Sequence, residues 1–378
     1  MTEHRVSPIE LFFDLVFVFA LTQVTTLWFE QPTWAGLGRG LLVLAALWWV
    51  WASYAWLTNA ADVEAGFVTG VLLCATAALF VAALAVPEAF GAQRFVFGGA
   101  FFVVMVAFVG LYAIVSKHEP DLLAAVLRTS WTVVPGAALV LVAAFVPSGA
   151  RPALWGVAFL AGFFGPIIAG VEGWRIQPAH FAERHSLIVI IAIGESLGAI
   201  GFGARGTHLG GEVIAAALLG FLVSSSFWLS YFDYASIAVQ DRLAANSGAQ
   251  QVALARDAYT YGHLPMVAGI SLFAFGMRET LKHVGAHLHW VPAVALCCGC
   301  ALYMFSFVAV RLRITHGIGR GRPVAMVAFA LLTLAATHVA AITALALVCV
   351  VCIGLHAYEL TRWREDRSRI RAGSLAEV

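Results

Sequence analysis

The chain has 378 residues, of which 61% are hydrophobic and only 11% are charged, and its formal net charge is +1 at pH 7. Soluble domains carry about 45–50% apolar and about 25% charged residues, so this composition excludes a soluble enzyme and indicates a protein of the lipid bilayer. The near-zero net charge excludes an electrostatic partner such as nucleic acid. The sequence therefore predicts an all-α, polytopic transmembrane helical bundle.

About twelve apolar stretches follow one another along the chain, and a membrane-spanning helix needs about 20 mostly apolar residues. Short connections that carry Gly, Pro or charged residues separate most of the stretches. The predicted spans are 8–28, 37–58, 66–87, 95–116, 122–146, 153–170, 184–203, 212–238, 258–281, 291–313, 323–336 and 339–360. The last two could instead form one long helix that is broken at Thr337 and His338.

Two similar short segments indicate an internal duplication. Residues 51–54 (Trp-Ala-Ser-Tyr) resemble residues 228–231 (Trp-Leu-Ser-Tyr), and each segment lies near the end of a predicted span. Six spans per half would give both halves the same orientation, so we expect two six-helix parallel repeats about an axis along the membrane normal. The predicted halves are 1–171 and 172–378, the second ending in a short basic cytoplasmic tail, and chance similarity between aromatic-rich helices is the alternative.

The distribution of Lys and Arg predicts the orientation in the membrane. With the N-terminus in the cytoplasm, 15 of the 22 basic residues fall on the inner side and six on the outer side, and Arg128 lies within a span. The inner set includes Arg184, at the predicted start of the seventh span. An even number of spans and two cytoplasmic termini are therefore expected.

Two motifs resemble the signatures of the bacterial low temperature requirement protein A family. They are Val6–Ala20 (VSPIELFFDLVFVFA) and His180–Ser196 (HFAERHSLIVIIAIGES), and the second contains Glu183, Arg184 and Ser196. The spacing of the motifs and the pattern of spans agree with that family over nearly the whole chain. The resemblance implies a bacterial inner-membrane protein that is linked to growth in the cold, and it implies no particular reaction.

Ionisable residues within the first and fifth spans are candidates for a polar path. Placing each of them inside the bilayer costs roughly 2.5–3.5 kcal/mol on insertion scales, so each needs a partner or a water-filled cavity. Glu10 and Asp14 lie four residues apart on one helix face, and Glu10 can also complete a capping box with Ser7. Asp14 and Arg128 are expected at a similar depth, so we expect them to pair. Such a pair would either lock two helices together or belong to a polar vestibule.

Glu195 is expected near the middle of the bilayer, among glycines that allow close helix packing. An isolated carboxylate there should be protonated, which suits either reversible proton carriage or a hydrogen bond to a neighbouring helix. The other polar-path candidates, expected in the cytoplasmic half of the bundle, are Tyr54, Tyr231, Asp233 and His263.

These residues favour transport or conduction of a small solute or ion, with proton coupling as one variant. The alternative is a membrane-embedded enzyme that acts on a lipid or isoprenoid-like substrate, and a third option is a non-catalytic protein that binds membrane components. No catalytic residue, metal site or cofactor is predicted. The chain has no phosphate-binding loop motif, which excludes an ATPase of that class, and its only two lysines lie at span ends, which disfavours a retinal Schiff base. The expected partners are the lipid bilayer and an unidentified small solute, ion or lipid, and homo-oligomerisation is left open.

The orientation can be tested by fusing reporter proteins to the C-terminus in a bacterial host. We expect a reporter that works only in the cytoplasm to be active and one that works only in the periplasm to be inactive, because the basic residues gather on the inner side. The reverse pattern of reporter activity would place the C-terminus in the periplasm and contradict the predicted topology with two cytoplasmic termini.

Overall fold

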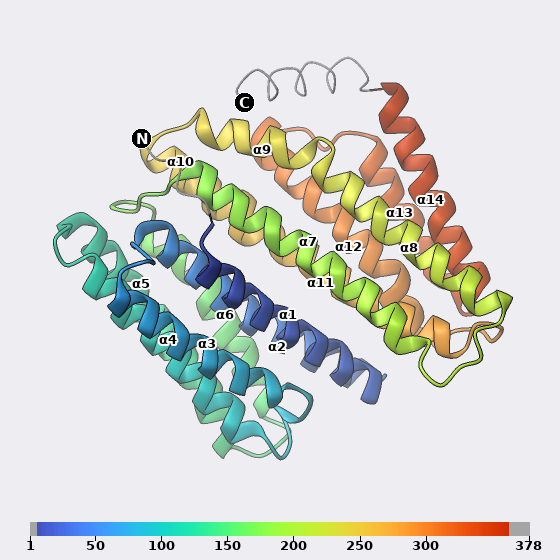
Figure 1. Ribbon diagram of the computed structural model, residues 1–378, viewed down its shortest axis with the longest axis horizontal. Helices are drawn as coiled ribbons and strands as arrows, with labels where there is room; N and C mark the ends of the chain where they lie inside the picture. Colours follow the sequence, from blue (N-terminus) through green and yellow to red (C-terminus); the bar gives the residue numbers. More distant parts are fainter. Residues whose placement is uncertain (1–5, 363–378) are drawn as a thin grey trace. The chain divides into compact units, whose positions relative to one another are not determined.

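The structure is a computed structural model that describes residues 6–362 (Figure 1). That part of the chain forms helices joined by short connections and contains no strand, which confirms the all-α prediction. The first six long helices are α1 (Pro8–Glu30), α2 (Trp34–Ala60), α3 (Gly66–Leu84), α4 (Arg94–Val115), α5 (Pro120–Val142) and α6 (Arg151–Ala169). The second six are α7 (Pro178–Gly203), α8 (Gly211–Phe232), α11 (Gly262–Lys282), α12 (Trp290–Thr315), α13 (Gly321–Ala336) and α14 (Ala341–Arg362).

Short helical segments complete the chain between these twelve helices. They are the 3-10 turns η1 (Val86–Glu88) and η2 (Ala143–Phe145), the helices α9 (Ala235–Ala244) and α10 (Gly248–Leu254), and the π-helical segment η3 (Ala255–Tyr261). Ten helices in the described range are long and apolar enough to cross a membrane. Helix α13 is shorter, and α11 is not among the ten. Helices α13 and α14 are separate and pack against each other, so the alternative of one broken helix is wrong.

The helices form two compact units. Unit 1 continues through His185 and includes Asn246–Ala255, whereas unit 2 holds Ser186–Ala245 and the helices from Arg256 onward. Helix α7 therefore gives its first turns to unit 1 and the rest of its length to unit 2. The division into the halves 1–171 and 172–378 stays a prediction.

Helix pairs follow one another in a similar order in the two units. In unit 1, α3 packs on α4, α4 on α5, α5 on α6, and α6 on α2. In unit 2, α11 packs on α12, α12 on α13, α13 on α14, and α14 on α8. The two segments that suggested a duplication lie in different surroundings, however, because Trp51 is buried and Trp228 is 43% exposed. The parallel repeat therefore stays a prediction.

Helices α11 and α12 touch along their backbones where both carry glycine. A Cβ atom added to Gly269 would lie 2.6 Å from the carbonyl oxygen of Gly299, and one added to Gly276 would lie 2.6 Å from the nitrogen of Leu296. Small residues allow membrane helices to approach this closely. These glycines hold the two helices together inside unit 2.

Candidate functional site

Two carboxylates are buried in the first two turns of α1. Ser7 caps the helix, and Glu10 turns back to accept hydrogen bonds from the Ser7 backbone nitrogen at 2.9 Å and from its hydroxyl at 3.1 Å. The predicted capping box is thus confirmed. Asp14 follows one turn later on the same face, and both side chains are buried, with 1% exposure for Glu10 and 0% for Asp14.

The guanidinium group of Arg184, from the second turn of α7, joins these two carboxylates. Its Nη1 lies 2.7 Å from Glu10 Oε1, and its Nη2 lies 2.7 Å from Asp14 Oδ1. Helix α2 adds two contacts: Thr58 Oγ1 accepts from Nη1 at 3.0 Å, and Trp51 Nε1 donates to Asp14 Oδ1 at 2.8 Å. All of these groups belong to unit 1, so three helices meet at one buried ion pair.

The expected pair between Asp14 and Arg128 is wrong. Arg128 is exposed on α5, where it donates to the backbone carbonyl oxygens of Ala169 at 3.3 Å and Glu172 at 2.6 Å. Asp14 pairs with Arg184 instead, because α7 begins at Pro178 and so carries Arg184 inside the helix, 1% exposed. Arg184 therefore does not lie in a cytoplasmic connection. Without it, the Lys and Arg residues used to predict the orientation number 14 on the inner side (15 minus this one) and six on the outer side.

Hydrogen bonds around Asn59 fix the proton position on His180. The backbone N–H of Gln177 donates to Asn59 Oδ1 at 2.7 Å, so the amide nitrogen of Asn59 faces the other way. That nitrogen lies 3.1 Å from His180 Nδ1 and can only donate, which makes Nδ1 an acceptor. His180 is therefore neutral, and its Nε2 donates to Glu10 Oε2 at 3.1 Å. We call Glu10, Asp14, His180 and Arg184 the charge cluster.

A small cavity lies beside the charge cluster. Its volume is about 10 Å³, and it is lined by Ile9, Glu10, Phe13, Tyr54, Thr58, Leu72 and Arg184. This is room for about one water molecule. The site can therefore admit a species of that size to Glu10 and Arg184, and it has no room for a lipid chain.

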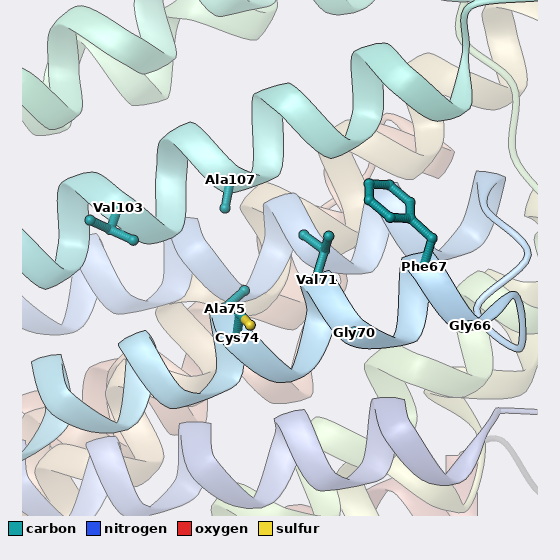
Figure 2. Close-up of a pocket in the computed structure, with 8 residues that line it drawn as sticks. All are labelled: Gly66, Phe67, Gly70, Val71, Cys74, Ala75, Val103 and Ala107. Atoms are coloured by element: carbon teal, nitrogen blue, oxygen red, sulfur yellow. The ribbon is translucent and has the colours of Figure 1, made fainter.

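A larger, apolar cavity of about 290 Å³ lies between α3 and α4 (Figure 2). Its walls are formed by Gly66, Phe67, Gly70, Val71, Cys74, Ala75, Val103 and Ala107. The figure shows Phe67 and Val71 of α3 on the side that faces α4, which contributes Val103 and Ala107. The walls present no carboxylate, amide, hydroxyl or basic side chain that could orient a polar solute, so this cavity is not the candidate site.

In unit 2, the structure brings together two of the predicted polar residues, Tyr231 and His263. His263 Nδ1 lies 3.1 Å from the carbonyl oxygen of Ala258 in η3, so Nδ1 carries the proton. Its other nitrogen, Nε2, lies 2.9 Å from the Tyr231 hydroxyl and accepts from it. The hydroxyl groups of Ser186 and Tyr231 are 3.4 Å apart, which extends the network to α7.

The remaining predicted residues lie at separate places within the two units. Glu195 is 6% exposed on α7, and its neighbour Ser196 is hydrogen-bonded to Ser224 of α8 at 2.8 Å. Asp233 is 9% exposed at the end of α8. In unit 1, the Tyr54 hydroxyl donates to the carbonyl oxygen of Val104 at 3.0 Å. Glu183 is exposed, and its carboxylate accepts from the Val6 nitrogen at 3.4 Å. Within residues 6–362, no group of three or more His, Cys, Asp and Glu residues could hold a metal ion.

The role of His180 and the pairing of Arg184 were missed in the sequence. The signal was present as a spacing, because Glu10 and Asp14 are four residues apart and so are His180 and Arg184. Residues four apart share a helix face, so each pair offers two groups of complementary chemistry to one partner helix. Trp51 and Thr58 gave no comparable signal, since nothing in their spacing identifies α1 and α7 as their neighbours.

One family model and one curated relative match this chain. The family model described as "Bacterial low temperature requirement A protein (LtrA)" matches residues 5–357. Uncharacterized protein RA0937 of Rhizobium meliloti (strain 1021) is 31% identical over 288 residues, which cover 72% of this chain and 69% of that protein. No solved structure matches the chain significantly.

The charge cluster predicts unequal effects for two arginine substitutions. Arg184→Gln should lower the free energy of unfolding by about 3–5 kcal/mol, because it leaves two buried carboxylates without their cation. Arg128→Gln is the matched control and should cost less, since Arg128 is exposed and bonds only carbonyl oxygens. Thermal unfolding of the detergent-purified variants measures both effects, and equal losses would contradict the assignment of Arg184 as the partner of Asp14.

Proposed function

This chain belongs to the bacterial low temperature requirement A family, and from that premise we propose that it transports or conducts a small solute or ion with coupling to protons. It is a multi-pass bacterial membrane protein. We further propose that it lies in the inner membrane with both termini in the cytoplasm.

The charge cluster is the observation that carries the proposal. A buried ion pair that served packing alone would be replaced by apolar residues at little cost, and often with a gain in stability. Here two carboxylates face one guanidinium group and a neutral histidine, so the cluster is one positive charge short. Ionisable groups of this kind inside membrane helices mark ion paths and proton relays.

Buried polar residues also occur on α7 outside the charge cluster. His180, Arg184, Glu195 and Ser196 are all buried along this one helix. A transporter needs several buried polar groups, and α7 supplies two of these in each unit.

The alternative of a membrane-embedded enzyme that acts on a lipid is not favoured. The cavity at the charge cluster has a volume of about 10 Å³, which suits a water-sized species and not a lipid. Both carboxylates of the cluster are also held by Arg184, so neither is presented as a nucleophile.

Proton flux into reconstituted vesicles tests the proposal. The purified protein would be placed in liposomes that contain a pH-sensitive dye, and a potassium gradient with valinomycin would supply the driving potential. We expect faster proton entry than in protein-free liposomes, with a dependence on pH that Glu195→Gln removes, because glutamine keeps the shape of the side chain but cannot carry a proton.

Glu212→Gln is the matched control, since Glu212 is an exposed glutamate at the start of α8, and its flux should equal that of the wild type. A Glu195→Gln protein with unchanged pH dependence would remove Glu195 from the path. If the wild-type rate never exceeds that of empty liposomes, the transport proposal is wrong.

A further inference from the structure

The charges of the buried cluster do not balance. Glu10 and Asp14 would together contribute two negative charges, and Arg184 contributes one positive charge. The tautomer fixed by Asn59 leaves His180 uncharged. One negative charge would remain in surroundings where each of the three charged side chains is at most 1% exposed, and such a charge is costly without a counter-ion.

The hydrogen bonds of the four carboxylate oxygens show where a compensating proton can bind. Glu10 Oε1 accepts from Arg184, and Glu10 Oε2 accepts from Ser7 and His180. Asp14 Oδ1 accepts from Arg184 and Trp51. Asp14 Oδ2 is buried and has no hydrogen-bond partner among the described residues. It is the one oxygen of the four that accepts no hydrogen bond among the described residues.

We propose that Asp14 is a proton-binding site, at which a proton on Oδ2 switches the charge cluster between a neutral and a singly negative state. Binding converts the Asp14 carboxylate and one proton into a carboxylic acid, and no other bond changes. The acid keeps its carbonyl-type oxygen, Oδ1, for the hydrogen bonds from Arg184 and Trp51. That this proton is the one coupled to movement of a solute or ion rests on the proposed function.

Few other ionisable groups face Asp14. On its own helix the nearest is Glu10, and α7 contributes Arg184 and His185, whose ring packs edge-on against Trp51 at 4.9 Å. Helices α2 and α3 and the turn η1 also pack against α1. The titratable or charged groups on these three elements are Arg39, Tyr54, Cys74 and Glu88. Cys74 and Glu88 are exposed, and Arg39 hydrogen-bonds Gln31 beyond the far end of α1. Arg184 is thus the nearby cation, and it is shared with Glu10.

Infrared difference spectroscopy of the full chain in liposomes detects the proton directly. At neutral pH the wild type should show the carbonyl stretch of a protonated carboxyl group, shifted in deuterated buffer. This band should be absent from Asp14→Asn and present in Glu195→Gln, which controls for a second buried carboxyl group outside the charge cluster. Identical spectra of wild type and Asp14→Asn would overturn the proposal.

Thermal unfolding keeps the proposal testable if a variant is poorly stable. Asparagine resembles the neutral acid, so Asp14→Asn should unfold close to the wild-type temperature, whereas Glu10→Gln should unfold earlier because both Glu10 oxygens accept from Arg184 or His180. An Asp14→Asn protein less stable than Glu10→Gln, or one that fails to fold, would overturn the proposal. A stabilisation of the wild type by sodium chloride over choline chloride that Asp14→Asn removes would also overturn it, in favour of a metal cation.

The spectroscopic result does not depend on flux. A carbonyl band from Asp14 in a protein that moves no protons would support the proton site. It would count against the proposed function and leave the proton site in place. Measurable wild-type flux without that band would overturn the proton site and leave the proposed function standing.

Discussion

One guanidinium group shared by two carboxylates determines how α1, α2 and the start of α7 pack against one another. Arg184 of α7 bonds Glu10 and Asp14 of α1, and Thr58 and Trp51 bring α2 to the same point. Because these groups are buried, bulk water cannot take over all of these bonds, so the three helices meet in the register that satisfies them. The capping of α1 depends on the same contacts, because the carboxylate that closes the helix start also receives a hydrogen bond from His180.

The charge cluster joins helices and also leaves one carboxylate oxygen of Asp14 available to bind a proton. Arg184 satisfies one oxygen of each carboxylate and leaves Asp14 Oδ2 without a protein partner in the described part of the chain. The cluster is therefore rigid in its geometry and incomplete in its charge. Under the proposal of a proton site at Asp14, the gain or loss of one proton changes the net charge of the cluster.

Local rules were enough to predict much of this fold. Each of the twelve apolar stretches corresponds to a helix, ten of them long and apolar enough to cross a membrane, and the spacing from Ser7 to Glu10 predicts the cap of α1, because both features depend on neighbouring residues. The span rule failed at Arg184, since it looks for an uninterrupted apolar stretch and so began the seventh span six residues after the helix begins at Pro178. The pairing of α1 with α7 links residues 170 or more positions apart, and no local pattern ranks one partner helix above another. Depth alone favours Arg128 as the partner of Asp14 in the sequence, and Arg128 lies on an exposed face of α5.

Glu10 and Arg184 interact directly inside the protein, and a double-mutant cycle measures the energy of that interaction. The free energy of unfolding would be determined in detergent for the wild type, Glu10→Gln, Arg184→Gln and the double variant. The structure predicts that the double variant loses less stability than the sum of the two single losses, with a coupling energy of about 2–3 kcal/mol, at the upper end for residues in contact. Strictly additive losses would show that the two side chains do not interact, and that result would contradict the buried ion pair on which the proposed site is built.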